Sequence, residues 1–416
     1  MRLRAAVAVL VAIDLLSRAS CDFPGPGSVS AEYFEGQQDL SITEIIQKCG
    51  YPVEVHVIET EDGYLLETYR IPYGRKSLTN QPNRYPVMVN HGLMGSSENF
   101  IIGGPNKAIT YMLADNGFDV WLMNARGSWH SRKHRYLDPD KDVKFWKFTW
   151  HEIGYYDIPN TIDYILALTK QRKVHYIGHS QGTTTFFAMG ASRPEYNDKI
   201  SVMVALAPSA ILRNIRDPIS KMLAPLYPQL TKIAESMKIY EMIPRQFMSN
   251  EGIRQVGKAL CGENSTMRQI CTNILSAMSL TPDEQIDPNT IPYIVAMGPG
   301  GASIYQAFHY AQILTKGKFV QYDWGPKENL RRYGSKLPPE YNLRNVTSPV
   351  ALIYGKGDEL ITKEDVEILG RMLPNVVEVY PVPYDKWTHM DFVWGKDIDT
   401  YLHHHVIKLL YRFNDQ

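Results

Sequence analysis

Apolar and polar residues alternate in short blocks along most of this chain. Val53–Ile58 and Tyr64–Ile71 are strand-like runs, and Asp62-Gly63 lies between them. An Asp-Gly pair between two such runs favours a tight turn, so these segments predict a β-hairpin. Six further short apolar runs predict strands at Pro86–Val89, Phe118–Leu122, Val174–Ile177, Ser201–Leu206, Val350–Tyr354 and Val376–Val382.

Helical patterns separate several of these predicted strands. Ile158, Ile162 and Ile165 recur near the helical period, and further helices are expected from Gln181 onward and over 363–373 and 398–411. Strands that alternate with helices indicate a mostly parallel sheet flanked by helices on both faces. The predicted class is therefore α/β.

The segment 212–300 breaks this alternation. Short amphipathic helical stretches carry Met222, Met237, Met242 and Met248 among other apolar residues. We expect a helical cap or lid inserted over the functional site, and the alternative is one more helical layer of the core. The expected organisation is a leader over 1–19, a first core part over 20–211, the cap over 212–300 and a second core part over 301–416.

Charge excludes some classes of partner. The 416 residues contain 44 basic and 44 acidic side chains, and no long basic run is present. Nucleic-acid-binding proteins usually carry a concentrated patch of basic residues, so no nucleic-acid partner is expected. No stretch is long and apolar enough to predict a transmembrane segment, which needs about 20 apolar residues.

The N-terminus predicts a secretory signal peptide. Arg2 and Arg4 precede the apolar run Ala5–Ile13, and small residues at Ser17 and Ala19 suit a cleavage site. The alternative is a short membrane anchor. A signal peptide would send the protein out of the cell or to the lysosome.

An oxidising compartment permits disulfides and glycans. The four cysteines are Cys21, Cys49, Cys261 and Cys271. They allow three pairings, which sequence alone does not distinguish. Asn264 and Asn345 each begin an Asn-X-Thr/Ser sequon, so both are predicted glycosylation sites.

Gly178-His179-Ser180-Gln181-Gly182 fits the G-x-S-x-G pattern. An apolar strand leads into it and a segment of small residues leaves it, which is the strand–turn–helix context that a nucleophile elbow requires. The alternative is a glycine-rich helix start with a capping serine. We expect Ser180 to be a catalytic nucleophile, which then needs a base to take its proton.

The base and its partner acid should follow in the order Ser, acid, His. His389 comes shortly after the last predicted strand, whereas His179 is next to the nucleophile and should point away from it. Asp358 follows the strand Val350–Tyr354 and is the predicted acid, with Glu359 and Asp365 as rivals. His403–His405 are expected to form a solvated patch on the terminal helix. The alternative is a metal site, which is disfavoured because three adjacent helix positions cannot all face one metal ion.

Two backbone N–H groups must stabilise the oxyanion. One is expected from Gln181, directly after the nucleophile, and the other from Leu93 in the His91–Gly95 loop. Neither a metal nor an organic cofactor is required for this chemistry.

At this point the sequence resembles the acid lipases, a family that includes gastric and lysosomal acid lipases and many insect relatives. The resemblance runs from about Gly50 to Tyr411. Its markers are Gly50-Tyr51-Pro52, Thr60-Glu61-Asp62-Gly63-Tyr64, Arg70-Ile71-Pro72-Tyr73-Gly74, His91-Gly92-Leu93, Asp119-Val120-Trp121-Leu122, Asn124-Ala125-Arg126-Gly127, Tyr156-Asp157-Ile158-Pro159, Gly178-His179-Ser180-Gln181-Gly182, Tyr322-Asp323-Trp324-Gly325, Gly355-Lys356-Gly357-Asp358 and His389-Met390-Asp391-Phe392.

The resemblance implies an α/β-hydrolase fold with a lidded cap, the triad Ser180, Asp358 and His389, and a disulfide between Cys261 and Cys271. It implies hydrolysis of neutral-lipid esters, of the triacylglycerol type, at an oil–water or membrane interface. The alternatives are a steryl or short-chain ester hydrolase and a non-catalytic lipid-binding protein on a lipase scaffold. The cap segment departs most from the family, which leaves the lid boundaries and acyl-chain preference open.

Overall fold

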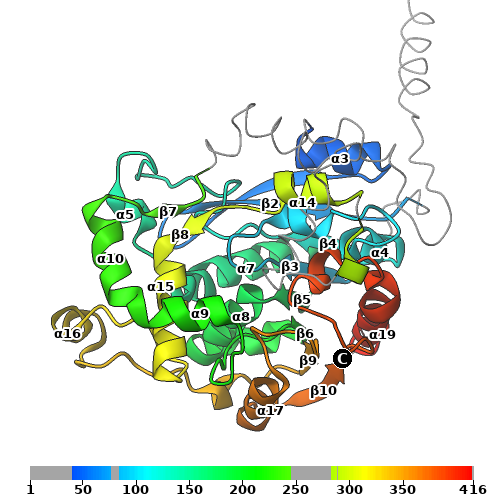
Figure 1. Cartoon of the computed structure of the whole chain (residues 1–416). Helices are drawn as coiled ribbons and strands as arrows, with labels where there is room; N and C mark the ends of the chain where they lie inside the picture. Colours follow the sequence, from blue (N-terminus) through cyan, green and yellow to red (C-terminus); the bar gives the residue numbers. More distant parts are fainter. Residues whose placement is uncertain (1–39, 76–83, 245–282, 288, 415–416) are drawn as a thin grey trace, which may run out of the picture.

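An eight-stranded sheet forms the centre of the molecule (Figure 1). The computed structural model describes residues 40–75, 84–244, 283–287 and 289–414. The strands lie in the order β1-β2-β4-β3-β5-β6-β9-β10. Their bounds are β1 Glu54–Glu59, β2 Leu65–Ile71, β3 Pro86–Asn90, β4 Asp119–Leu122, β5 Val174–His179, β6 Ile200–Leu206, β9 Val350–Tyr354 and β10 Val376–Pro381.

The sheet is antiparallel at one edge and parallel elsewhere. β1 pairs with β2 as a hairpin in which Glu59 lies opposite Leu65, and β2 runs antiparallel to β4. From β4 through β10 all neighbouring strands run parallel. The expected hairpin and the expected mostly parallel sheet are therefore both confirmed.

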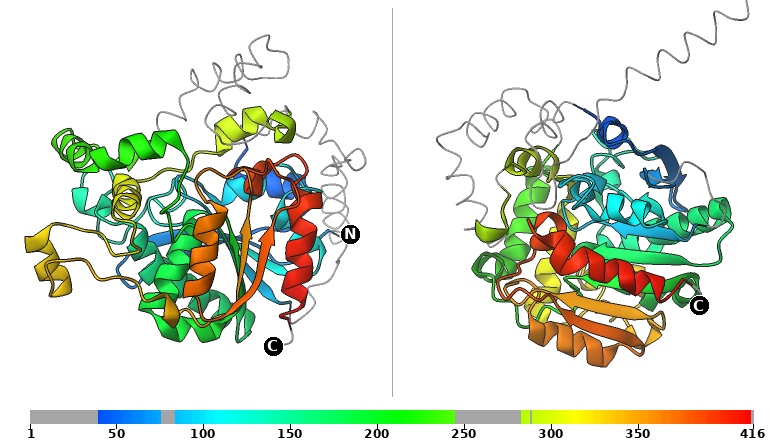
Figure 2. Two further views of the ribbon diagram at one scale, coloured as in Figure 1. Left: turned by 60° about the horizontal axis from the view of Figure 1, so that its bottom comes forward. Right: turned by 90° about the vertical axis from the view of Figure 1, so that its right-hand side faces the viewer.

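Helices cover both faces of this sheet. The residues of β3, β5, β6 and β9 are all buried, as expected for strands with a covered surface on each side. Figure 2 shows α17 (Lys363–Met372) and α19 (His404–Tyr411) on opposite faces. Other helices of the core are α3 Ile42–Lys48, α4 Ile109–Asp115, α5 Val143–Trp146, α6 Trp150–Glu152, α7 Ile158–Thr169, α8 Gln181–Ser192 and the short α18 Asp391–Trp394.

The terminal histidines do not form the expected solvated patch. His403 is buried, and its Nδ1 lies 2.7 Å from the carbonyl oxygen of Lys107. His404 is exposed, whereas His405 stacks on Tyr380 with ring centroids 3.8 Å apart. Adjacent helix positions point about 100° apart, so three consecutive side chains face three different environments.

Several helices connect β6 to β9. Within the predicted cap these are α9 (Pro218–Leu223), α10 (Tyr227–Ser236) and α14 (Ile291–Met297). The short strand β7 (Glu241–Met242) pairs with β8 (Ala302–Ser303), just past the predicted end of the cap. Helices α15 Ile304–Lys316 and α16 Pro326–Tyr333 follow before β9. The limits 212 and 300 remain predictions.

Some sequence predictions lie outside the described residues. These are the signal peptide over 1–19, Cys21, the Cys261–Cys271 disulfide, the Asn264 glycan and the position of Met248. Cys49 is buried at the end of α3. Asn345 is half-buried, and its side-chain amide donates to the carbonyl of Ala191 at 3.2 Å. A glycan would take one of the two hydrogens of this amide nitrogen. Glycosylation at Asn345 remains a prediction.

Among the described helices, none combines the length and the apolar character needed to cross a bilayer.

Candidate active site

Ser180 lies at a sharp turn between β5 and α8. Its backbone has φ 51° and ψ −116°, a conformation that non-glycine residues rarely adopt. The N–H of Ser180 donates to the carbonyl of Leu206 on β6 at 2.9 Å, which ties the turn to the neighbouring strand. Backbone strain of this kind costs about 1–3 kcal/mol and persists because the surrounding structure enforces it.

The turn is possible because glycines lie two residues on either side of Ser180. A Cβ on Gly178 would lie 2.7 Å from the carbonyl carbon of Gly182. A Cβ on Gly182 would lie 2.5 Å from the backbone oxygen of Asn90 on β3. Both distances are shorter than any tolerated contact, so strand and helix can approach this closely only with glycine at these positions.

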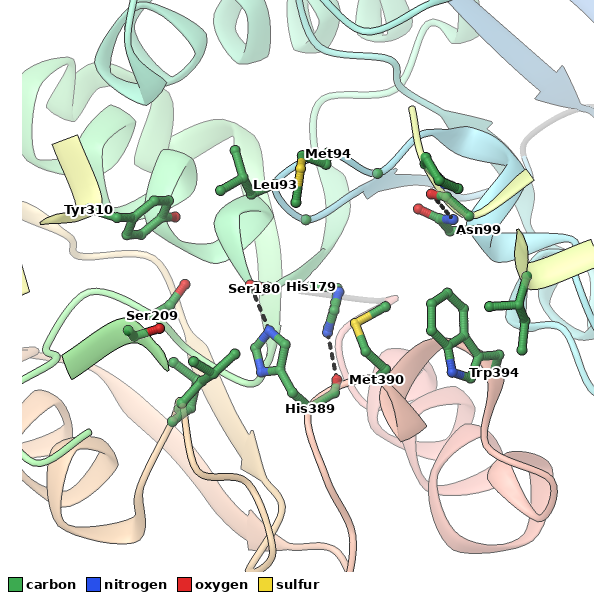
Figure 3. A pocket seen from close by; sticks show the side chains of 18 of the residues that line it. Leu93, Met94, Asn99, His179, Ser180, Ser209, Tyr310, His389, Met390 and Trp394 are labelled. Carbon is green, nitrogen blue, oxygen red and sulfur yellow. Dashed lines mark hydrogen bonds between the residues drawn. The ribbon is translucent and has the colours of Figure 1, made fainter. Parts of the chain in front are cut away.

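Three side chains from distant parts of the chain meet at this turn. The Oγ of Ser180 lies 2.8 Å from Nε2 of His389 (Figure 3). Nδ1 of His389 lies 2.8 Å from Oδ2 of Asp358. A carboxylate only accepts hydrogen bonds, so Nδ1 carries the proton and Nε2 is left to accept the hydroxyl of Ser180. His389 and Asp358 are buried and Ser180 is half-buried.

The second oxygen of Asp358 is held by the backbone. Its Oδ1 accepts the N–H groups of Leu360 at 2.8 Å and Ile361 at 3.0 Å. The rival carboxylate Asp365 points elsewhere and accepts both the backbone and side-chain amides of Asn214 at 2.9 and 2.8 Å. Asp358 is therefore the carboxylate that orients the imidazole of His389.

His179 is buried directly beside this group. Its Nε2 lies 3.0 Å from the carbonyl oxygen of His389, to which it can donate (Figure 3). Burial, together with the nearby imidazole of His389, lowers the pKa of His179 to about 3, so its ring is neutral. His179 thus fixes the loop that carries His389, a role that the sequence analysis did not identify.

The loop after β3 is held by a second buried histidine. The carbonyl of Gly92 accepts the N–H of Gly95 at 3.1 Å and lies 2.8 Å from Nδ1 of His91. Nε2 of His91 accepts the N–H of Ala125 at 3.1 Å, so Nδ1 is the protonated nitrogen. Burial lowers the pKa of His91 to about 4 and keeps it neutral.

This arrangement fixes the direction of the Leu93 N–H. The peptide unit is planar and trans, so a fixed Gly92 carbonyl sends the N–H of Leu93 the opposite way. Gln181 is the first residue of α8, and its N–H lies among the helix donors that have no partner within the helix. Leu93 and Ser180 line the same cavity.

That cavity has a volume of about 670 Å³ and is lined mainly by apolar side chains. Its walls come from the loop after β3, the loops after β6 and β9, and from α9, α14, α15 and α18 (Asp391–Trp394). A site of this size and character suits a small molecule with a substantial hydrocarbon part. Within the described residues, no group of three or more His, Cys, Asp or Glu side chains is arranged to hold a metal ion.

Two family models match the chain. One, the partial α/β-hydrolase lipase region, matches residues 42–104, and the other, the α/β-hydrolase fold, matches residues 85–396. A solved structure titled as a putative lipase from Sulfolobus solfataricus is 14% identical, with a TM-score of 0.53, and covers 86% of this chain and 99% of its own. At that identity the likeness concerns the fold alone.

Curated relatives are more similar in sequence. Lipase 3 of Drosophila melanogaster is 39% identical over 88% of this chain and 91% of its own length. Human gastric triacylglycerol lipase is 34% identical over 89% of this chain and 91% of its own length. On its fold, the matches to both models and these relatives, the chain belongs to the α/β-hydrolase family of lipases.

Proposed function

We propose that this protein hydrolyses carboxylic esters of neutral lipids, triacylglycerols first among them, through an acyl-enzyme on Ser180. The observation that carries the proposal is the continuous hydrogen-bonded chain from Ser180 through His389 to Asp358, with both links at 2.8 Å. An unactivated hydroxyl is a poor nucleophile, and this arrangement is how a protein activates one.

The reaction proceeds in two steps. His389 takes the proton of Ser180 as Oγ attacks the ester carbonyl, and the backbone N–H groups of Leu93 and Gln181 stabilise the oxyanion. His389 then protonates the leaving alcohol. Water, activated by the same imidazole, attacks the acyl-enzyme and releases the fatty acid, while Asp358 stabilises the imidazolium in both steps.

The cavity supports a lipid substrate. Its lining is mainly apolar and includes Met94 and Met390, whose flexible side chains adapt to irregular hydrocarbon shapes. Four gastric relatives, those of cattle, mice, humans and rats, are named triacylglycerol lipases. Transfer of that substrate class to this chain is part of the proposal.

Exposed apolar side chains of the cap support action at a lipid surface. Large apolar side chains are exposed along 219–243, and they are Ile219, Met222, Leu223, Leu226, Leu230, Ile233, Met237, Ile239 and Ile243. These nine make up more than half of the seventeen exposed large apolar residues of the described chain. A patch of this kind marks a binding surface for an apolar partner, which here is the surface of a lipid droplet or membrane.

The proposed location follows from the N-terminal sequence. A basic start, a short apolar run and small residues near Ala19 support entry into the secretory pathway, with release from the cell or delivery to the lysosome as the destination.

The test is hydrolysis of emulsified tributyrin, trioctanoin and triolein, with cholesteryl oleate as a competing class, by the wild type and by Ser180→Ala. We expect hydrolysis of the triacylglycerols and a loss of several orders of magnitude in Ser180→Ala, whose melting temperature should match the wild type. Preference for the cholesteryl ester would favour the steryl alternative. Absence of hydrolysis by the folded wild type would overturn the proposal.

A further inference from the structure

The cavity extends to two sides of Ser180. In Figure 3, Tyr310 and Ser209 lie on one side of the Ser180–His389 pair, and Asn99 and Trp394 lie on the other. We call these parts the Tyr310 arm and the Trp394 arm. An ester has two substituents, the acyl chain and the alcohol, and they must leave the carbonyl carbon in different directions.

The Trp394 arm is built from three segments that pack together. Asn99 lies in η2 (Ser97–Phe100), and both α14 and α18 pack against this turn. The amide Nδ2 of Asn99 donates to the carbonyl of Gly298 at 2.9 Å, and its Oδ1 accepts the N–H of Ser96 at 3.0 Å. The amide is thus engaged by the protein. The cavity-lining side chains of the two helices that pack on this turn are apolar, namely Ile294 and Val295 of α14 and Trp394 of α18.

The Tyr310 arm carries hydroxyl groups. The hydroxyl of Thr184 lies 2.7 Å from the Tyr310 hydroxyl and 2.8 Å from that of Ser209, and Tyr310 and Ser209 both line the cavity. Ser220 of α9 lines the cavity as well. Leu314, one helical turn after Tyr310 on α15, also lines the cavity, so this arm combines apolar side chains with hydroxyl oxygens that a glyceryl group can contact.

Trp394 lines both the cavity that contains Ser180 and a second, smaller cavity. Trp394 is the lining residue that these two cavities share, and the smaller one has a volume of only about 10 Å³. Lys107 and Asp287, whose Nζ and Oδ2 atoms lie 3.9 Å apart, also line the smaller cavity.

We propose that Trp394 closes the acyl-chain arm of the site and thereby sets the length of fatty acyl chain that is hydrolysed best. The inference rests on the proposed ester hydrolysis and adds the residue that determines acyl specificity. Binding of a hydrocarbon chain becomes more favourable with each methylene that enters an apolar arm. Further methylenes add nothing once the chain reaches the end of the arm.

Replacing the indole by a small side chain lengthens the arm. The surface of an indole equals that of roughly five methylene groups or more. The charged pair Lys107–Asp287 limits the extension, because a hydrocarbon chain cannot displace water from charged groups without cost. We therefore expect the optimum to move by about two to four carbons.

The experiment compares two ester series with the wild type, Trp394→Ala and Trp394→Leu. In the first series the acyl chain of p-nitrophenyl esters is lengthened, and in the second the alcohol of acetate esters is lengthened. Trp324→Ala is the matched control, because Trp324 is also half-buried but does not line the cavity. Trp394→Leu keeps an apolar side chain and provides a milder change if Trp394→Ala folds poorly.

We expect kcat/KM in the acyl series to peak at longer chains in Trp394→Ala, with a smaller shift in Trp394→Leu and none in Trp324→Ala. The alcohol series should keep its profile in all variants. An unchanged acyl profile in both Trp394 variants, or a shift confined to the alcohol series, would overturn this inference while ester hydrolysis stood. Absence of hydrolysis by the wild type in either series would instead overturn the proposed function.

Discussion

Functional side chains at the edge of the sheet are held in place by hydrogen bonds, whereas many apolar side chains of the cap above it are exposed to solvent. At the sheet edge, Ser180, His389 and Asp358 are each held by hydrogen bonds of defined length, and His179 and His91 hold the backbone around them. In the cap, Met222 on α9 and Met237 directly after α10 are instead 64% exposed to solvent.

The two regions are suited to different tasks, namely catalysis and contact with a lipid surface. Bond-making chemistry needs atoms placed to within a fraction of an ångström, which buried hydrogen bonds and strained turns provide. Contact with a lipid surface needs apolar area and no fixed geometry. Substitutions at the sheet edge should therefore reduce activity or stability far more than substitutions on the cap.

The largest effect is expected for Asp358→Asn. An amide cannot hold the imidazole of His389 in the tautomer that leaves Nε2 free to accept, so kcat should fall by about 10³–10⁴. Asp365→Asn is the control, since that carboxylate accepts hydrogen bonds from Asn214 and lies on the same segment after β9. Steady-state kinetics on a soluble ester would measure both. A loss in Asp358→Asn no larger than in Asp365→Asn would contradict the assignment of the acid.

A smaller effect, on stability, is expected for Gly182→Ala. The new Cβ would lie 2.5 Å from the oxygen of Asn90, so strand and helix must move apart, at a cost of about 2–4 kcal/mol in the free energy of unfolding. Gly370→Ala on α17 is the matched control, because its nearest neighbour would lie at an ordinary 3.6 Å. Urea denaturation would compare the two, and equal stability of both variants would show that the elbow is not sterically constrained.

The smallest effect is expected on the cap. Ile233 of α10 is 52% exposed, and Ile233→Lys removes apolar contact with a lipid surface without touching the triad. Hydrolysis of emulsified triolein should fall by roughly tenfold or less, while hydrolysis of a soluble ester should not change. Val57→Lys on β1, where the side chain is 59% exposed, should leave both activities unchanged. Equal losses on both substrates in Ile233→Lys would argue against the interface.

The same contrast explains what the sequence could predict. The elbow around Ser180 is a local pattern, and the strands and the positions of Asp358 and His389 at strand ends followed from short apolar runs. The expected sheet and hairpin were found in the structure, with strand limits that differ by one or two residues.

Contacts between distant loops that carry no sequence motif were not predictable. The bonds from His179 to the His389 carbonyl and from His91 to Gly92 depend on how loops meet across the sheet, and no local pattern encodes that. The burial of His403 was missed because it depends on which side of the terminal helix faces the core. Trp394 carried no sequence signal, since its proposed role rests on the two cavities that it lines.

The most direct test of the central claim is to treat the folded protein with an organophosphonate and to locate the adduct by peptide mass spectrometry. The claim is that the hydroxyl of Ser180 is activated by the imidazole of His389. We expect one adduct, on the peptide that contains Ser180, formed in proportion to the loss of ester hydrolysis and absent from His389→Ala. Full loss of activity with Ser180 unmodified, or full modification of Ser180 with activity retained, would contradict it.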